Sequence, residues 1–106
     1  MNTKSIGTKE IEKLYGRLTF AGLVKAHRLG EEMSQVEMAK FLKLSKQALN
    51  DIENGRKIPS IKRTIHLAKK IGLLPELAIE LVLQDQLAKE KVSFLIKVTP
   101  GKKKVA

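Results

Sequence analysis

Apolar residues recur every three or four positions along most of the chain, and glycine and proline fall between the segments that carry this pattern. The segment TFAGLVKAHRL is an example, with Phe20, Leu23, Val24 and His27 at positions i, i+3, i+4 and i+7. Such spacing places apolar side chains on one face of an α-helix, whereas a half-buried strand alternates with a period of two. The sequence therefore predicts an all-α fold, a bundle of short helices.

Start signals place two short helices in the middle of the chain. Ser34, followed three residues later by Glu37, has the pattern of a capping box. Ser45 can cap a further helix in the same way, because its hydroxyl oxygen can accept a hydrogen bond from the first turn. The two helices are expected over residues 34–43 and 45–54, with almost no linker between them.

Further helices are expected on both sides of this pair. One should begin after Thr8, another should stop at Gly72, and the last should begin at Pro75, which suits the first turn of a helix. The chain is thereby divided into an N-terminal extension that is partly helical (1–18), a helical domain (19–90) and a C-terminal segment (91–106).

The C-terminal segment departs from the helical pattern. VSFLIKV, Val92 to Val98, is dense in β-branched and aromatic residues with a period closer to two, which predicts a short strand. A continuation of the last helix from Glu90 is the alternative. A single strand leaves its edge unpaired, so it would need another segment or a twin in a dimer. The final TPGKKKVA cannot build a core and is expected to be disordered.

The last helix has more apolar residues than one buried face requires. ELAIELVLQDQL is apolar around much of its circumference. We expect one face to close the core and the other to form a symmetric dimer. The predicted homodimer interface includes Leu77, Leu81, Val82 and Phe94.

The charge of the chain indicates an anionic partner. Its 106 residues suffice for one domain, and 21 Lys and Arg against 11 Asp and Glu give a net charge of +10. Nucleic acid is the first candidate, with a membrane surface as competitor. Since no apolar run approaches the roughly 20 residues that cross a bilayer, and no secretory signal is visible, we expect a cytoplasmic protein without a membrane partner.

The residues present give little support to catalysis or metal binding. The chain has no cysteine and two histidines, His27 and His66, which fall on or beside apolar helical faces. Neither a thiolate nor a zinc site can be assembled from them. Nothing combines a nucleophile, a base and an orienting group, and no Gly-rich phosphate loop follows a strand. We expect no enzymatic activity, no metal and no cofactor.

The second helix of the central pair has a wholly polar stripe. Gln47, Asn50, Asp51 and Asn54 lie at i, i+3, i+4 and i+7. Two short, adjacent helices are typical of the helix-turn-helix unit, whose second helix enters the major groove of DNA. The stripe is the candidate surface for reading bases. A solvated face of any surface helix has the same pattern, and that alternative remains open.

The stretch SQVEMAKFLKLSKQALNDIENGRKIPSIKRTIHLAKKIG resembles the helix-turn-helix domain of the lambda-type phage repressor and Cro proteins, the xenobiotic-response-element family. The resemblance covers roughly Leu23 to Leu83 and depends on Arg28 and the motifs SQ, MA, LS, IENG and P. It implies a five-helix DNA-binding domain. The implied contacts are Lys46, Gln47, Asn50 and Asp51 with bases, and Gln35, Ser45, Arg56 and Lys57 with phosphates.

The same resemblance separates the two acids of this helix. Glu53 lies on the protein side and is expected to form a structural ion pair with Arg28, whose planar fork suits a bidentate carboxylate contact. Asp51 lies on the polar stripe, where it can accept a hydrogen bond from a cytosine amino group or disfavour a guanine or phosphate opposite it. The alternative for Asp51 is a solvated side chain paired with Lys46 or Lys57.

The turn between the two helices departs from the family pattern. The family commonly has glycine there, where the backbone tends to positive φ, and this chain has Lys43. A residue other than glycine in that conformation costs about 1 kcal/mol. We expect a slightly rebuilt turn.

Taken together, these features predict a dimeric, sequence-specific regulator that binds double-stranded DNA and represses its own operon. An antitoxin with a toxin partner is one refinement. A protein-interaction module with the same fold, or a stand-alone phage-type repressor, is the alternative.

Overall fold

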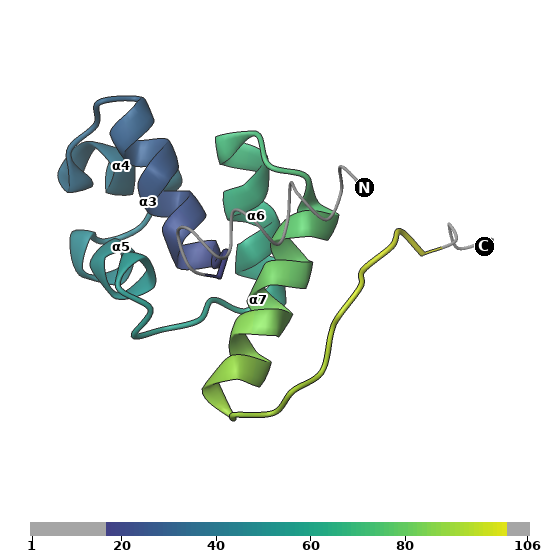
Figure 1. The fold of residues 1–106 in the computed structure, drawn as a ribbon. Helices are drawn as coiled ribbons and strands as arrows, with labels where there is room; N and C mark the ends of the chain where they lie inside the picture. Colours follow the sequence, from purple (N-terminus) through teal and green to yellow (C-terminus); the bar gives the residue numbers. More distant parts are fainter. Residues whose placement is uncertain (1–16, 102–106) are drawn as a thin grey trace, which may run out of the picture.

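Residues 17–101, the part of the chain that this computed structural model describes, contain five α-helices and an extended C-terminal segment (Figure 1). The helices are α3 (Phe20–Gly30), α4 (Gln35–Leu42), α5 (Lys46–Glu53), α6 (Ile61–Ile71) and α7 (Pro75–Lys89). The all-α prediction is confirmed, and no strand occurs within these residues. The helix expected after Thr8 lies outside the described residues.

Ser34 and Ser45 cap the starts of α4 and α5, as the sequence predicts. Ser34 Oγ accepts a hydrogen bond from the backbone N–H of Glu37 at 3.1 Å, and the Glu37 carboxylate accepts from the Ser34 N–H at 2.7 Å. This is the predicted capping box. Ser45 Oγ likewise accepts from the N–H of Ala48 at 3.0 Å. These bonds satisfy amides that a helix start leaves without partners, and so they fix where both helices begin.

The turn between α4 and α5 keeps its left-handed residue although that residue is not glycine. Lys43 has φ 58° and ψ 45°. Its N–H bonds to the carbonyl of Lys40 at 3.1 Å, and the N–H of Leu44 bonds to the carbonyl of Ala39 at 2.8 Å. Leu44 also packs against the core. The expected rebuilding of the turn is wrong, because these hydrogen bonds and this contact offset a backbone cost of about 1 kcal/mol.

All five helices contribute to one hydrophobic core. Its buried members are Phe20, Val24, Met38, Ala39, Leu42, Leu49, Ile52, Leu67, Ala68, Ala78, Leu81 and Val82. The packed helix pairs are α6 with α7, α4 with α5, and α3 with both α5 and α7. The turn between α4 and α5 is short, so this core holds the two helices in a fixed relation to each other.

Two residues predicted for the dimer interface lie in this core instead. Leu81 is 7% exposed and Val82 is fully buried. Both pack inside the single chain because the apolar circumference of α7 supplies the core on that side. The sequence did not indicate which of its apolar faces would be buried. Leu77, 40% exposed, and Phe94, 68% exposed, remain at the surface.

After α7 the chain turns and runs as an extended segment (Figure 1). Lys91 has φ 59°, and the N–H of Val92 returns to the carbonyl of Leu87 at 3.0 Å, which closes the helix. Residues 92–98 therefore do not continue the helix, and that expectation is corrected. They do not pair as a strand within the described chain, and pairing with a twin in a dimer stays a prediction. Side chains of α7 bind the backbone of this segment in place of a neighbouring strand.

Candidate nucleic-acid interface

The polar stripe of α5 faces away from the core. Leu49 is fully buried and Ile52 is 4% exposed, so the opposite face of this helix is turned to the solvent. Gln47 is exposed on that face, while Asn50 and Asp51 are half-buried among their neighbours. Helix α5 thus has one apolar face against the core and one polar face toward the solvent, as the spacing in the sequence indicates.

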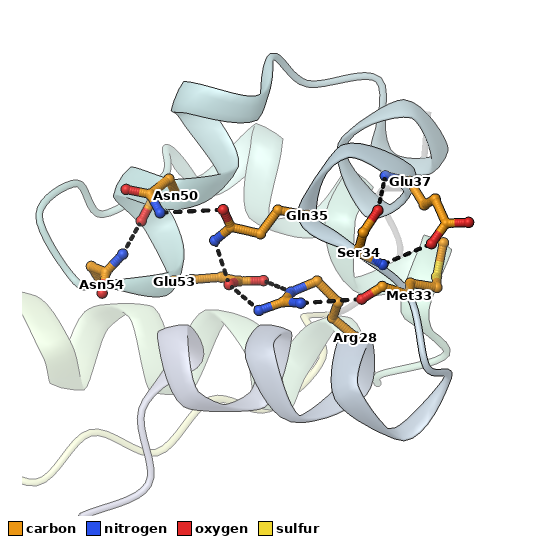
Figure 2. Close-up of polar contacts among 8 residues, drawn as sticks. All are labelled: Arg28, Met33, Ser34, Gln35, Glu37, Asn50, Glu53 and Asn54. Atoms are coloured by element: carbon orange, nitrogen blue, oxygen red, sulfur yellow. Dashed lines mark hydrogen bonds and ion pairs between the residues drawn. The ribbon is translucent and has the colours of Figure 1, made fainter.

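On the inner side of α5, three side chains form what we call the inner cluster: Arg28, Gln35 and Glu53 (Figure 2). Arg28 donates from Nε to Glu53 Oε2 at 2.8 Å and from Nη2 to Glu53 Oε1 at 3.1 Å. Its Nη1 donates to the carbonyl of Met33 at 3.1 Å. Gln35 Nε2 adds a third hydrogen bond to the carboxylate, at 3.0 Å.

The inner cluster contains an ion pair, Arg28 with Glu53, that is almost out of contact with water. The side chains of Arg28 and Glu53 are 12% and 2% exposed. Burial acts to raise the pKa of Glu53, but the hydrogen bonds from Arg28 and Gln35 and the charge of Arg28 outweigh it. The pKa of Glu53 therefore lies below its ordinary value. The cluster ties α3, α4 and α5 together at one point.

On the outer side of α5, a second group of side chains forms what we call the outer cluster: Gln47, Asn50, Asp51 and Arg56. Arg56 Nε and Gln47 Nε2 each donate to Asp51 Oδ1, both at 2.9 Å. Arg56 also donates from Nη2 to Asn50 Oδ1. The hydrogen bond from Arg56 lowers the pKa of Asp51 against an opposing effect of burial. The members of the outer cluster thus bond to one another in the free protein.

The partner of Asp51 differs from both expected lysines. Arg56 pairs with it, rather than Lys46 or Lys57. The reason is the turn after α5, where Gly55 has φ 72° and the backbone N–H groups of Arg56 and Lys57 bond to the carbonyl of Asp51 at 2.9 and 3.2 Å. This turn brings the Arg56 side chain back along the helix.

Comparison with known proteins agrees with this geometry. A family model described as helix-turn-helix matches residues 24–77, about half of the chain. The chain belongs to the helix-turn-helix family. Over 51 residues it is 45% identical to the "ImmF control region 10 kDa protein" of Bacillus phage phi105, and the alignment covers 48% of this chain and 57% of that protein. The resemblance inferred from the sequence is confirmed, and no solved structure gives a significant match.

A link that the sequence did not reveal joins the two clusters of this helix-turn-helix unit. Asn50 Nδ2 donates to Gln35 Oε1 at 3.4 Å, and Gln35 in turn donates to Glu53 (Figure 2). Gln35, expected to contact phosphate, therefore has both ends of its amide engaged within the protein. The signal in the sequence was weak, because a glutamine opening one helix and an asparagine in the next can equally face solvent.

Basic and hydroxyl groups are exposed at both ends of α5. Ser45 and Lys46 lie at its amino end, and Arg56 and Lys57 follow its carboxyl end. The Ser45 oxygen accepts the capping bond, which leaves its hydroxyl hydrogen available to donate. Within residues 17–101, none of the helices has the length and apolar composition needed to cross a membrane. The same residues contain no group of three acidic, His or Cys side chains placed to hold a metal ion.

Proposed function

We propose that this chain is a sequence-specific regulator of transcription that binds double-stranded DNA as a dimer and represses its target. The observation that carries the proposal is the outward polar face of α5, rigidly held by the inner cluster and flanked by Lys46, Arg56 and Lys57. A helix placed in this way fits the major groove, and a net charge of +10 favours association with the phosphate backbone.

We assign the base contacts to the exposed end of α5 and to its polar stripe, namely Lys46, Gln47, Asn50 and Asp51. An amide side chain can donate to and accept from the major-groove edge of adenine, and a carboxylate can accept from the amino group of cytosine. Before it reads a base, Gln47 must give up its hydrogen bond to Asp51 or share it.

We assign the phosphate contacts to Gln35, Ser45, Arg56 and Lys57. These groups lie at the start of α4 and at the two ends of α5, where a groove-bound helix approaches the two strands of the backbone. Because Gln35 Nε2 carries two hydrogens and uses one for Glu53, the second can donate to a phosphate oxygen. Such contacts fix the register of the domain on DNA and carry no base information.

The relative from Bacillus phage phi105 supports a regulatory role, since its name places it in a control region. Repression of this type commonly uses a palindromic operator bound by two subunits, with the reading helices about 34 Å apart. Between the roles considered from the sequence, the name of this relative favours a phage-type repressor. The antitoxin role, with its toxin partner, stays a prediction.

The test is selection of bound fragments from a random pool of duplex DNA, followed by sequencing. A palindromic consensus with half-sites one helical turn apart is expected. On that consensus, the logarithm of affinity should fall linearly with the logarithm of salt concentration, with a slope near −0.9 per phosphate contact. A pool without enrichment, or binding that is independent of salt, would contradict the proposal and favour an interaction module with the same fold.

A further inference from the structure

The extended segment after α7 is held by a regular set of hydrogen bonds along one edge. Gln84 Nε2 donates to the carbonyl of Phe94 at 2.8 Å, and Gln84 Oε1 accepts from the N–H of Ile96 at 2.6 Å. Glu80 Oε1 accepts from the N–H of Val98 at 2.9 Å. Every second residue of the segment therefore bonds to α7.

The spacing of these bonds follows from the geometry of the two elements. Glu80 and Gln84 are four residues apart on α7, a rise of about 6 Å, and two residues of extended chain advance by about 6.6 Å. The pairs Gln84 with Ile96 and Glu80 with Val98 show that the segment runs antiparallel to the helix. The side chains of Glu80 and Gln84 thus satisfy the backbone groups of this edge, as a neighbouring strand does in a sheet.

The opposite edge of the segment has the complementary set of groups. In extended chain, the N–H and C=O groups of successive residues point to opposite sides. Since Phe94, Ile96 and Val98 use the side toward α7, the backbone groups of Ser93, Leu95 and Lys97 point away from it. Among residues 17–101, the hydrogen bonds include none from the backbone of these three. An edge that the described residues leave unpaired in this way is a template for another strand.

We propose that this edge pairs with the same edge of a second copy of the chain, antiparallel and centred on Leu95. The resulting two-stranded ribbon joins two subunits. This inference rests on the proposed function in one respect: the ribbon is the interface of the dimer that a palindromic operator requires.

The proposed register is the one in which the backbones of the two segments pair along their whole length. With Leu95 opposite Leu95, residues 92–98 of each chain overlap completely, and the outward groups of Ser93 in one chain meet those of Lys97 in the other. The side chains of Val92, Phe94, Ile96 and Val98 then share one face of the ribbon and make it apolar in both chains. A register shifted along the chain leaves part of the segment unpaired.

Charge also favours this arrangement over the alternatives. The antiparallel pairing centred on Leu95 places the uncharged Ser93 opposite Lys97, whereas a parallel pairing in register would place each Lys97 against its own copy. Like charges directly opposite each other destabilise a pair of strands. The ribbon is therefore complementary to itself in backbone, side-chain size and charge.

Apolar side chains are exposed both on this segment and on α7. Leu95 is 95% exposed and Phe94 is 68% exposed. Leu77, 40% exposed, lies one turn before Glu80, at the end of α7 toward which the segment runs. A two-stranded ribbon alone is marginal, and a stable interface buries about 800 Å² on each partner. These apolar side chains provide the additional area, which a second copy would cover.

Single cysteines test the register, because the chain itself has no cysteine. In full-length Leu95→Cys, the two Cα atoms at the centre of the ribbon should lie about 5.5 Å apart, within disulfide range. Oxidation without DNA should convert most of this variant into a covalent dimer. Full-length Ser93→Cys and Lys97→Cys should each stay uncrosslinked, since each cysteine would lie about 13 Å along the strands from its own copy. An equal mixture of the two should crosslink.

The outcomes distinguish the ribbon from other contacts. Equal crosslinking of all three single variants, or stronger crosslinking of Ser93→Cys with itself, would overturn the proposed register. A Leu95→Cys variant that does not crosslink would overturn the ribbon. A wild-type chain that sediments as a monomer would also overturn it, even if the edge then binds another protein.

A backbone variant tests the pairing independently of cysteine chemistry. Full-length Leu95→Pro lacks the central outward N–H but keeps the N–H groups that bond to Gln84 and Glu80. It should sediment as a monomer at concentrations where the wild type is a dimer, while the control Leu95→Ala, which keeps the N–H, should stay a dimer. Dimers of undiminished stability in Leu95→Pro would contradict the proposal.

Binding to the selected DNA is measured separately on the wild type. A chain that crosslinks through Leu95→Cys but selects no DNA would keep the ribbon and overturn the proposed function. A wild-type monomer that selects half-site DNA would overturn the ribbon and the dimer but keep the proposed sequence-specific binding of DNA.

Discussion

The carboxylates of two arginine–carboxylate pairs, Asp51 and Glu53, lie two residues apart at the end of α5, and the pairs differ in how much water reaches them. Arg28 and Glu53 are joined at 2.8 Å with side chains 12% and 2% exposed. Arg56 and Asp51 are joined at 2.9 Å with side chains 53% and 14% exposed. Arg28 bonds to both oxygens of Glu53, whereas Arg56 bonds to Oδ1 of Asp51 alone. The shortest distances are nearly the same, and the exposed fractions of the side chains show the larger difference.

Burial determines what each pair can do. A buried carboxylate cannot exchange its partner for water, so loss of that partner leaves an uncompensated charge inside the protein. An exposed pair is screened by solvent and salt, and its members can separate at little cost. Glu53 is therefore suited to hold α5 against α3 and α4, whereas Asp51 and Arg56 can open when DNA offers other partners.

The largest expected effect is on the inner pair. Glu53→Ala should destabilise the fold by about 3 kcal/mol, because Arg28 would remain largely buried without its carboxylate. Chemical denaturation, followed by circular dichroism, measures this loss, with Asp51→Ala on the same helix as the matched control. DNA binding should weaken only as far as the folded fraction falls. Full stability of Glu53→Ala together with altered base preference would place Glu53 in the groove and refute the comparison.

The inner pair was predictable from the sequence and the outer pair was not. The position of Glu53 beside Ile52, on the buried side of a helix, already turns it inward, and the family resemblance supplies Arg28 as its partner. The partner of Asp51 depends on the path of the chain after Gly55, which returns Arg56 along the helix. Residue spacing does not encode that path.

The same contrast holds for the fold. Helix starts at Ser34 and Ser45 were predictable because capping is a local interaction between residues three apart. The conformation of residues 92–98 was not, because it depends on the side chains of Glu80 and Gln84, which lie 10 to 18 residues from the backbone groups that they bind. Helical and strand periodicities describe buried faces, and neither describes an extended chain held by side chains of a helix.

The next effect concerns specificity within the outer cluster. Gln47→Ala should lower affinity for the preferred operator by about 2 kcal/mol and change affinity for random DNA little, because an amide contact to adenine is lost. Lys57→Ala is the matched control, since a lost phosphate contact should weaken all sequences alike and reduce the salt slope by about one unit. Titrations on operator and random duplexes at several salt concentrations measure both. Equal losses of specificity in the two variants would contradict these assignments.

A smaller effect is expected from pH. The pKa of Glu53 lies below its ordinary value of 4.5 in the folded chain, so the unfolded chain binds the proton more readily. The stability that Glu53 contributes is therefore complete above about pH 4.5 and is lost as the pH falls through the folded pKa. Melting temperatures measured across this acidic range should fall more steeply for the wild type than for Glu53→Gln. Parallel curves would show that the inner pair does not contribute to the acid response.

The smallest effect on stability, and the one most specific to the outer pair, is expected for Asp51→Ala. The melting temperature should stay close to that of the wild type, because the Arg56 side chain is 53% exposed and keeps its contact with water when Asp51 is removed. Arg56 and Gln47 would lose their common acceptor, so Arg56 could bind a phosphate on any sequence. Affinity for random DNA should therefore rise, the salt slope should steepen by about one unit, and the specificity ratio should fall. Asp51→Asn is the control, since it keeps an acceptor for Arg56 but removes the charge. If Asp51→Ala instead binds random DNA more weakly than the wild type, Asp51 would be positioning Arg56 for its phosphate rather than restraining it.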